Sequence, residues 1–410
     1  MEIYLVGGAV RDKLLNLPVT ERDWVVLGET PESLLKLGFR PVGKDFPVFL
    51  HPETQEEYAL ARTERKTAHG YKGFSVYSAP DVTLEEDLIR RDLTINAMAI
   101  ASDGRVIDPY NGQRDLEQRV FRHVSPAFAE DPVRILRVAR FAARYSTLGF
   151  TLAAETRELM QTMVEAGEVD YLVSERVWAE LLKALGEKSP PAFFTTLKAC
   201  GALAKIFPEL DNLFGVPQPA QYHPEIDTGL HSLMCLEQAA FLSTSPEVRF
   251  AALVHDLGKA LSPKENWPHH YGHETLGLPI LEAMCGRLRI PNAFKALAQQ
   301  VMQYHTHCHK AAELRSSTLT DTLATLGAFK PTNTLEKFLL ACEADARGRT
   351  GFENRPYPQA DLFRLAANAA VSIDISDIVN GALQGAKIGE AIRQLRIQAV
   401  TEAIQAYKSL

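Results

Sequence analysis

Cysteine is sparse in this chain of 410 residues, and long apolar runs are absent. The five cysteines are Cys200, Cys235, Cys285, Cys308 and Cys342. They are odd in number and form no CxxC pair, so they indicate neither a disulfide framework nor a cysteine zinc site and fit a reducing compartment. No apolar run approaches the roughly 18 residues needed to cross a bilayer. The beginning of the chain, MEIYLVGGAVRD, also lacks the basic segment and apolar core of a secretory leader. We therefore expect a cytoplasmic protein with no membrane partner.

The two best-known phosphate-binding loops are missing as well. The sequence contains neither GxxxxGK[ST] nor a strand–GxGxxG–helix pattern. A formal net charge of −7 argues against a protein that coats nucleic acid everywhere, although a local basic surface remains compatible with it. No repeat of 20 to 50 residues is apparent.

The sequence divides into two regions of different composition. Up to about residue 125, short β-branched runs alternate with helical patterns, and strands are predicted at 2–6, 23–28, 47–50, 56–61 and 105–110. From about residue 130 the composition predicts helices throughout. A chain that is 46% hydrophobic can build several cores. We predict an α+β protein, with a mixed sheet and helices at the N-terminus followed by an all-α body.

Paired acids stand near the start, in the stretch YLVGGAVRDKLLNLPVTERDWVVLG. Residues i and i+2 of a strand point to the same face, so Glu21 and Asp23 are predicted to present two carboxylates side by side. Such hard oxygen ligands suit Mg²⁺, which takes its remaining ligands from water and substrate phosphates. Glu57, on a neighbouring predicted strand, is a candidate third acid.

A glycine turn precedes these acids. Gly7 and Gly8 stand between a strand and a helix, where the backbone can approach a phosphate and the helix N-terminus favours an anion. Arg11 lies one turn into that helix, within reach of the same phosphates. Taken separately, a GG turn and alternate acids are usually structural. Their order, strand–GG–helix–ExD–strand, is what favours a functional interpretation.

Arginine dominates the next region. Residues 90–144 contain ten Arg, no Lys and seven acids. At 100° per residue, Arg134, Arg137, Arg140 and Arg144 fall in one sector of a helix, while Ile135, Val138, Ala142 and Tyr145 fall on another face. A solvated face with salt bridges is the usual explanation of such a run. The absence of Lys favours flat, forked recognition of phosphates or base edges instead.

These motifs resemble a known family. GGAVRD followed by ERDWVVLG, then ARTER (61–65), RRDLTINAMAI (90–100) and EDPVRILRVARFAAR (130–144), resemble in sequence and order the class II tRNA nucleotidyltransferases and bacterial poly(A) polymerases. This resemblance implies a polymerase-β-like nucleotidyltransferase head in which Glu21 and Asp23 are catalytic and hold Mg²⁺. The family usually has Asp where Glu21 stands. The resemblance also implies that Arg91 contacts the nucleotide and that Asp92 and Asn96 support the site.

The same resemblance implies that protein side chains, instead of a nucleic-acid template, select the incoming nucleotide. In class II enzymes the EDxxR motif reads the incoming base, and here it maps to Glu130, Asp131 and Arg134, with Arg137 and Arg140 beyond. Cytosine and adenine both offer an amine donor beside a ring-nitrogen acceptor, which suit a carboxylate and a guanidinium. Uracil and guanine present the reverse pattern and are expected to be rejected by roughly 10⁴-fold. Gly8 and Arg11 complete the predicted nucleotide site.

A histidine-aspartate doublet marks the helical body. VRFAALVHDLGKAL carries His255 and Asp256 within an apolar helix pattern. It resembles the HD phosphohydrolase superfamily, which implies the metal ligands His231, His255, Asp256 and Asp345. Mixed imidazole and carboxylate ligands suit a transition metal, Ni²⁺ foremost, with Co²⁺, Mn²⁺ or Zn²⁺ as alternatives. Further histidines follow at His273, His305, His307 and His309, and the last three are open to interpretation as a polar helix end.

Together the resemblances cover essentially the whole chain and match the HD-containing CCA-adding enzymes of proteobacteria. They imply addition and repair of the 3′-terminal CCA of tRNA from CTP and ATP. They also imply phosphatase, 2′-nucleotidase and 2′,3′-cyclic phosphodiesterase activities for the HD site. The expected domains are a head (1–125), a helical nucleotide-selecting and tRNA-binding region (126–220), an HD domain (221–350) and a helical tail (351–410). The acceptor arm of tRNA is the expected partner, and a monomer or weak homodimer is the expected state.

Four alternatives stay open at this point. A poly(A) polymerase shares the head, but the chain ends in a near-neutral helix rather than a basic extension. A CC-adding enzyme lacks the flexible loop of the family, whereas residues 61–75 fill that place here. An HD phosphohydrolase with a non-catalytic RNA-binding head is a third possibility, disfavoured by the presence of Asp23. A protein that only binds other molecules is the fourth alternative, and it requires both groups of predicted metal ligands to be coincidental.

Overall fold

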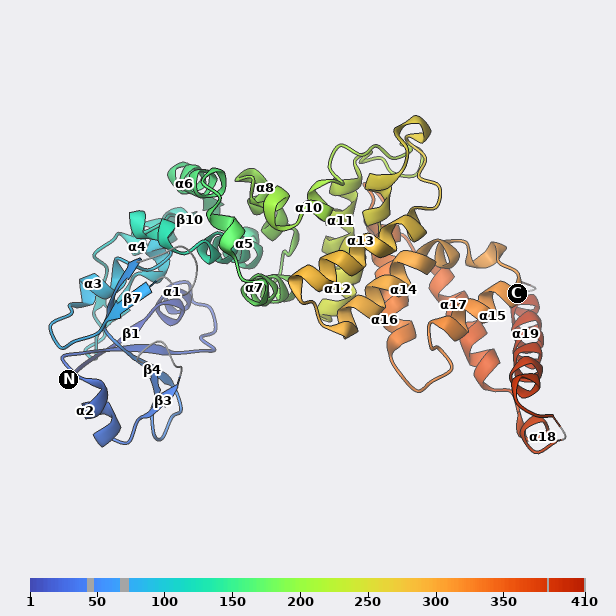
Figure 1. Ribbon diagram of the computed structural model, residues 1–410, viewed down its shortest axis with the longest axis horizontal. Helices are drawn as coiled ribbons and strands as arrows, with labels where there is room; N and C mark the ends of the chain where they lie inside the picture. Colours follow the sequence, from blue (N-terminus) through green and yellow to red (C-terminus); the bar gives the residue numbers. More distant parts are fainter. Residues whose placement is uncertain (43–47, 67–73, 382, 409–410) are drawn as a thin grey trace. The chain divides into compact units, whose positions relative to one another are not determined.

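The computed structural model describes residues 1–42, 48–66, 74–381 and 383–408. The chain forms two compact units, one spanning Met1–Ile206 and the other Phe207–Leu410. The first unit contains every strand of the described chain, and the second is helical (Figure 1). This arrangement confirms the predicted α+β class. The finer division at residues 125, 220 and 350 stays a prediction.

A mixed seven-stranded sheet organises the first unit. In spatial order its strands are β3 (Arg40–Val42), β4 (Val48–Leu50), β5 (Glu57–Leu60), β2 (Asp23–Leu27), β1 (Glu2–Val6), β8 (Ala99–Ile100) and β9 (Val106–Ile107). Only the β2–β5 pair is parallel, and the other neighbours run antiparallel. Each strand predicted from the sequence is present, though β9 is shorter than expected.

Strand β2 is apolar because both of its faces are covered. Val25 packs in a core with Val6, Leu84 and Leu88, whereas its neighbour Val26 packs in a second core on the other face with Phe49. Successive side chains of a strand point to opposite faces. The run WVVL therefore satisfies two cores at once, and this fixes β2 at the centre of the sheet.

Helices and two small sheets complete this unit. The helices are α1 (Gly8–Leu14), α2 (Pro31–Lys36), α3 (Leu84–Leu88), α4 (Gly112–Gln118), α5 (Val133–Tyr145), α6 (Ala154–Glu165), α7 (Ser174–Gly186), α8 (Pro191–Ala199) and α9 (Ala202–Ile206). Strands β6 (Thr63–Lys66) and β7 (Phe74–Tyr77) pair with each other. The flexible loop expected at 61–75 includes β6 and the start of β7, and its residues 67–73 lie outside the described residues. The prediction of helix throughout from residue 130 is wrong at one point, because β11 (Thr151–Leu152) pairs with β10 (Val120–Phe121). Two residues are too short to leave a periodic signal.

The second unit consists of helices packed in layers. They are α10 (Pro208–Asp211), α11 (Thr228–Leu242), α12 (Pro246–Val254), α13 (His273–Leu288), α14 (Asn292–His309), α15 (Ser316–Thr325), α16 (Thr334–Arg347), α17 (Pro358–Val371), α18 (Ser376–Val379) and α19 (Ala386–Lys408). Helices α11, α12, α14 and α16 pack on one another, and α19 packs on α15 and α17. Within the part of the chain that the structure describes, no helix has the length and apolarity needed to span a membrane.

Candidate functional sites

The glycine turn, an acid and an arginine meet at one corner of the sheet. Antiparallel register places Val6, the last residue of β1, opposite Asp23, the first residue of β2. Gly7 follows with φ of 68°, a conformation that favours glycine. A Cβ at Gly7 would lie 3.1 Å from Arg91 Nη1 and 3.9 Å from Asp23 Oδ2. The turn therefore leaves room for Arg91 and Asp23 at the same point.

Glu21 lies outside strand β2, in the irregular segment before it. The expectation that it shares a strand face with Asp23 is therefore wrong, because the strand begins at Asp23. The two acids still interact. Loss of water around Asp23 raises the pKa of its carboxyl, the charge of Glu21 raises it further, and Arg91 opposes both effects. Glu57 lies directly opposite Asp23 on β5, which confirms the prediction of a neighbouring strand. Acids at this corner favour a bound divalent cation.

Arg91 is held in place by Asp87 at the end of α3. A capping box starts this helix, in which Thr83 Oγ1 accepts from Glu86 N and Glu86 accepts from Thr83 N. Asp87 then accepts 3.1 Å and 2.9 Å hydrogen bonds from Arg91 and Arg90. Asp87 is buried, and the two arginines outweigh its desolvation and lower its pKa. The sequence analysis missed Asp87, although its spacing to Arg91 is that of a helical ion pair.

Arg11 is buried, with 3% of its surface exposed. Its guanidinium donates to Asp12 Oδ1 at 2.9 Å and to Asn96 Oδ1 at 2.6 Å, and it lies over the ring of Tyr145. The guanidinium also lies close to Gly8, because a Cβ at Gly8 would be 3.3 Å from Arg11 Nη2. The structure therefore gives Arg11 a role in joining α1 to the segment around Asn96. Contact of Arg11 or Gly8 with a nucleotide stays a prediction.

Asp92 is the centre of a second buried network. Its Oδ2 accepts from Arg137 Nε at 2.8 Å, and its Oδ1 accepts from Asn96 Nδ2 at 2.9 Å. Burial opposes ionisation, but the charge of Arg137 and these hydrogen bonds outweigh it and hold the pKa of Asp92 well below its ordinary value. The supporting role expected for Asp92 and Asn96 matches these contacts.

The arginine face of α5 is bonded to other parts of the protein, and two of its arginines are buried. Arg134 and Arg140 are both 8% exposed. Arg134 donates to the carbonyl oxygens of Ala127 and Arg90, at 2.7 Å and 2.6 Å. Arg144 donates to Asp12 at 3.0 Å. These bonds tie α5 to the RRDLTINA segment and to α1, which explains why so many arginines share one helix. Direct nucleotide contacts by Arg134, Arg137 and Arg140 stay predictions.

Helix α7 supplies two residues that the sequence analysis missed. Arg176 donates to both oxygens of Asp131, at 3.2 Å and 2.8 Å, and Glu180 accepts from Arg140 Nε at 2.6 Å. Asp131 Oδ1 also accepts from Val133 N at 3.0 Å, which ties the carboxylate to the start of α5. The spacing of Arg176 and Glu180 by four residues places them on one face of α7. That spacing is a weak signal, since it is common in any charged helix.

In the second unit, helix packing brings the predicted metal ligands together. His231 lies on α11, His255 and Asp256 follow α12, and Asp345 lies on α16. His231 Nε2 is 3.2 Å from Asp345 Oδ1, and His255 Nε2 is 3.1 Å from Asp256 Oδ2 and 3.6 Å from Asp345 Oδ2. These residues are buried, at 2% exposure or less. Cys235, one turn after His231, also belongs to the cluster and was not predicted.

The outer nitrogen of His231 has its own partners. Nδ1 lies 2.9 Å from Gly348 O and 3.0 Å from Glu225 Oε1. Both are acceptors, so Nδ1 carries the hydrogen and Nε2 presents a lone pair to the cluster. A ligating imidazole commonly has such a carboxylate or carbonyl behind it. Glu225, three residues before the helix, gives no periodic signal by which the sequence alone could find it.

Three further histidines surround the cluster. His273 begins α13, and its Nε2 lies 3.3 Å from Asp256 Oδ1. His305 is buried on α14, and His309 at the end of that helix is 2.6 Å from Asp345 Oδ2. The interpretation of the histidines at the end of α14 as a polar helix end is wrong for these two. It fits His307, which hydrogen-bonds Thr322 instead.

The charges of this cluster suit a cation. Burial opposes ionisation of Asp256 and Asp345, yet the charge of His255 outweighs it and holds both pKa values well below the ordinary range. His255 Nε2 and both oxygens of Asp256 are buried and, among the described residues, complete no well-aligned hydrogen bond. Lys259 Nζ lies 2.6 Å from Asp256 Oδ2. With its ring neutral, His255 presents a lone pair at Nε2, and an imidazole beside carboxylates is the set of ligand types that a transition metal prefers.

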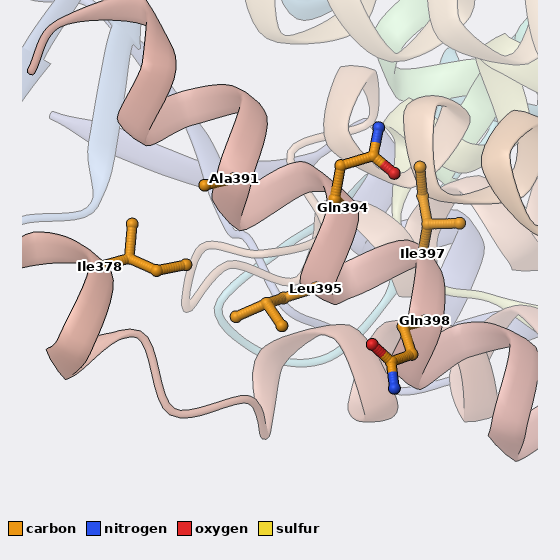
Figure 2. Close-up of a pocket in the computed structure, with 6 residues that line it drawn as sticks. All are labelled: Ile378, Ala391, Gln394, Leu395, Ile397 and Gln398. Atoms are coloured by element: carbon orange, nitrogen blue, oxygen red, sulfur yellow. The ribbon is translucent and has the colours of Figure 1, made fainter. Parts of the chain in front are cut away.

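A hollow on the second unit offers no comparable chemistry. Figure 2 shows side chains of α18 and α19 around it, namely Ile378, Ala391, Gln394, Leu395, Ile397 and Gln398. These are aliphatic and amide side chains, without a titratable group. The histidine cluster is therefore the stronger candidate in this unit.

Family models match three parts of the chain. Residues 3–122 match the poly A polymerase head domain, residues 149–214 match a probable RNA and SrmB-binding site of polymerase A, and residues 228–345 match the HD domain. The fold and its sites thus define a protein with a polymerase-type nucleotidyltransferase head and an HD unit.

Full-length relatives are more specific. The chain is 67% identical over 401 residues to the multifunctional CCA protein of Methylococcus capsulatus, covering 98% of this chain and 94% of the relative. It is 62% identical over 404 residues to the multifunctional CCA protein of Nitrosococcus oceani, covering 98% and 99%. The chain belongs to the family of multifunctional CCA proteins.

Solved structures share the fold at lower identity. The Thermotoga maritima CCA-adding enzyme complexed with tRNA matches with a TM-score of 0.63 and 21% identity, covering 99% of this chain and 91% of that one. The Bacillus stearothermophilus CCA-adding enzyme in complex with CTP matches with a TM-score of 0.64 and 22% identity, covering 98% and 89%. At this identity the likeness concerns the fold.

Proposed function

We propose that this protein adds and repairs the 3′-terminal CCA of tRNA, using CTP and ATP without a nucleic-acid template. The observation that carries the proposal is the register that places Gly7, Asp23 and Arg91 at one corner of the sheet. Family membership supports the same activity. The reaction is attack of the tRNA 3′-hydroxyl on the α-phosphate, with pyrophosphate leaving.

The residues of the head have distinct roles in this reaction. Glu21 and Asp23 would hold Mg²⁺, which when bound supplies charge stabilisation at the attacking and leaving oxygens. Arg91, which donates to Asp87, would bind phosphate oxygens beside Asp23. The Gly7 turn lets the backbone approach the triphosphate.

Base selection falls to Asp131 and Arg134. The carboxylate of Asp131 would accept from the amine of cytosine or adenine, and the guanidinium of Arg134 would donate to the adjacent ring nitrogen. Arg176 and the carbonyl oxygens of Ala127 and Arg90 hold these two groups in orientation. Uracil and guanine would leave both groups mismatched, which is the basis of rejection.

The HD unit is proposed to hydrolyse phosphate esters at damaged tRNA ends, as a phosphatase, 2′-nucleotidase and 2′,3′-cyclic phosphodiesterase. His231, His255, Asp256 and Asp345 would hold a transition metal, Ni²⁺, Co²⁺ or Mn²⁺ by ligand type, which when bound lowers the pKa of water. The buried acceptors of His255 and Asp256 support this assignment. Lys259 and Arg349 add positive charge near Asp256 and Asp345, where a substrate phosphate would be stabilised.

One experiment separates these activities. Full-length protein with Mg²⁺ is given tRNA lacking CCA and each labelled nucleoside triphosphate, and separately 2′,3′-cyclic AMP with Ni²⁺. Addition of two C and then one A is expected, and it should be lost in Asp23→Ala while hydrolysis persists. His255→Ala should show the opposite pattern. Long A tails would instead indicate a poly(A) polymerase, and hydrolysis without any incorporation would indicate a phosphohydrolase with a binding head.

A further inference from the structure

Lys259 is a buried cation beside the proposed HD site. It is 8% exposed, and its Nζ lies 2.6 Å from Asp256 Oδ2 and 2.6 Å from Gln218 Oε1. Of these two contacts, the one with Gln218 is a well-aligned hydrogen bond, whereas neither oxygen of Asp256 completes one among the described residues. Charge therefore draws the ammonium to Asp256, but Gln218 decides the direction in which it points.

Gln218 reaches Lys259 from a distant part of the chain. It stands between α10 and α11, 41 residues before Lys259, and is 2% exposed. An ammonium only donates hydrogen bonds, so the oxygen of the amide, and not its nitrogen, faces Lys259. Gln218 Nε2 is buried and has no hydrogen-bond partner within the described part of the chain. Buried donors are rarely left unpaired, so the contact with Lys259 is what fixes the orientation of this amide.

A closed ring of contacts holds Lys259 at both ends. Its ammonium donates to Gln218 Oε1, and its carbonyl oxygen accepts from Ser262 Oγ at 2.7 Å. Ser262 Oγ lies 2.5 Å from His270 Nδ1, and His270 Nε2 donates to Pro217 O at 2.8 Å. Pro217 directly precedes Gln218, which closes the ring. The side chain of Lys259 and the amide that it contacts are thus parts of one hydrogen-bonded framework.

The backbone of Gln218 is bonded to a strained residue. Gln218 N donates to Ile226 O at 2.6 Å, and Ile226 has φ of 62°, in the left-handed region that a β-branched residue rarely adopts. Asp227, next in the chain, pairs with Pro217 and accepts from Leu230 N at 2.8 Å at the start of α11. Strained residues persist where the surrounding structure over-determines them, and they gather at functional sites. These bonds fix the segment that carries Gln218.

We infer that Gln218 is a positioning residue of the HD site, and that its amide oxygen aims the Lys259 ammonium at an oxygen of the substrate phosphate. The inference rests on the proposed phosphohydrolase activity. An ammonium has three N–H groups. Gln218 accepts from one, and Asp256 faces the ammonium from a second direction, which leaves the third for a phosphate oxygen. A charged donor of fixed direction stabilises the negative charge that develops on the phosphate during hydrolysis.

A double-mutant cycle on the full-length protein tests whether Gln218 acts through Lys259. Hydrolysis of 2′,3′-cyclic AMP with Ni²⁺ is measured in Gln218→Met, Lys259→Met and the double variant. We expect each single variant to lower kcat by roughly 10- to 100-fold with less change in KM, as for the loss of a charged hydrogen bond. The double variant should be no slower than Lys259→Met, because Gln218 has nothing to orient once the ammonium is gone.

Three further measurements separate positioning from a merely structural role. The affinity for Ni²⁺, measured by titration, should be unchanged in Gln218→Met. Gln221→Met, exposed in the same segment, should hydrolyse the substrate like the parent protein. Gln218→Glu has nearly the same size and keeps an oxygen that accepts from the ammonium, so it should lose less activity than Gln218→Met. The Glu variant also tests the contact if Gln218→Met fails to fold.

Other results would overturn the inference. Multiplied losses in the double variant would show that Gln218 and Lys259 act independently. An equal loss in Gln218→Glu and Gln218→Met would exclude the role of the amide oxygen, as would unchanged hydrolysis in Gln218→Met. Weaker Ni²⁺ binding in Gln218→Met would assign the residue to the metal site instead. Absence of hydrolysis in the parent protein would overturn the phosphohydrolase activity itself, so that failure is distinguishable from a failure of Gln218 alone.

Discussion

Arg176 donates to both carboxylate oxygens of Asp131, across 45 residues of sequence, at 3.2 Å and 2.8 Å. Asp131 is the residue proposed to accept from the amine of the incoming base, and Arg176 lies on a different helix. The bidentate pair fixes the plane of the carboxylate before any nucleotide is present. In the proposed mechanism, base selection would therefore depend on Arg176 of α7 as well as on the EDxxR motif.

Replacing Arg176 by Gln should loosen base selection. A charged hydrogen bond contributes about 1.5–3 kcal/mol, so we expect CTP and ATP incorporation to fall by roughly 10- to 100-fold, with a smaller loss for UTP. The ratio of kcat/KM for CTP over UTP measures this effect. Arg105→Gln, which removes an exposed pair with Asp103, is the control and should leave the ratio unchanged. An unchanged ratio in Arg176→Gln would contradict the role given to this residue.

Replacing Gly7 by Ala should damage the head in a way that a comparable glycine does not. Both Gly7 and Gly104 have positive φ, 68° and 87°, so Ala costs about 1 kcal/mol at either position. A Cβ at Gly7 meets Arg91, whereas a Cβ at Gly104 meets open space. We expect Gly7→Ala alone to raise the KM for CTP and to lower kcat, measured by CCA addition at matched protein stability. Equal activity in the two variants would show that the Gly7–Arg91 contact is unimportant.

Replacing Asp92 by Asn should destabilise the protein in a pH-dependent way. The pKa of Asp92 is lowered in the folded state, so its contribution is fully present above its unfolded value of about 3.9 and is lost as the pH falls through the folded value. We expect a loss of about 1–3 kcal/mol at neutral pH that shrinks below about pH 4. The urea midpoint of the full chain between pH 3 and pH 8 measures it. Asp103→Asn, in an exposed pair, should change little, and a difference independent of pH would refute the linkage.

Replacing Glu225 by Gln should weaken the HD metal site while leaving the head intact. Glu225 accepts from the outer nitrogen of His231 and so supports the lone pair that faces the cluster. Loss of such a partner commonly lowers metal affinity by about 10- to 100-fold. Titration with Ni²⁺ measures the affinity, and CCA addition should be unchanged. Glu237→Gln, exposed on the same helix as His231, is the control, and an equal loss in both variants would count against Glu225.

Local pattern was enough to determine much of this protein. The run at Glu2–Val6, the glycine turn, the apolar strand from Asp23 and the amphipathic helix α5 follow from periodicities of two and 3.6 residues. The HD doublet and the paired acids could be recognised as candidate metal ligands from the sequence, because residue type and short spacing are enough to indicate that chemistry. The family resemblance added the order of the motifs.

Tertiary structure alone decided which distant residues became partners. Asp131 meets Arg176, Asp92 meets Arg137, and Glu225 meets His231 over separations that no local period encodes. The burial of Arg134 and Arg140 on α5 could not be predicted from the sequence either, because a row of arginines has the same helical spacing whether water or protein groups face it. Strand register and helix packing settle these pairings, since they depend on how whole faces fit together and on the glycines that allow the closest approaches.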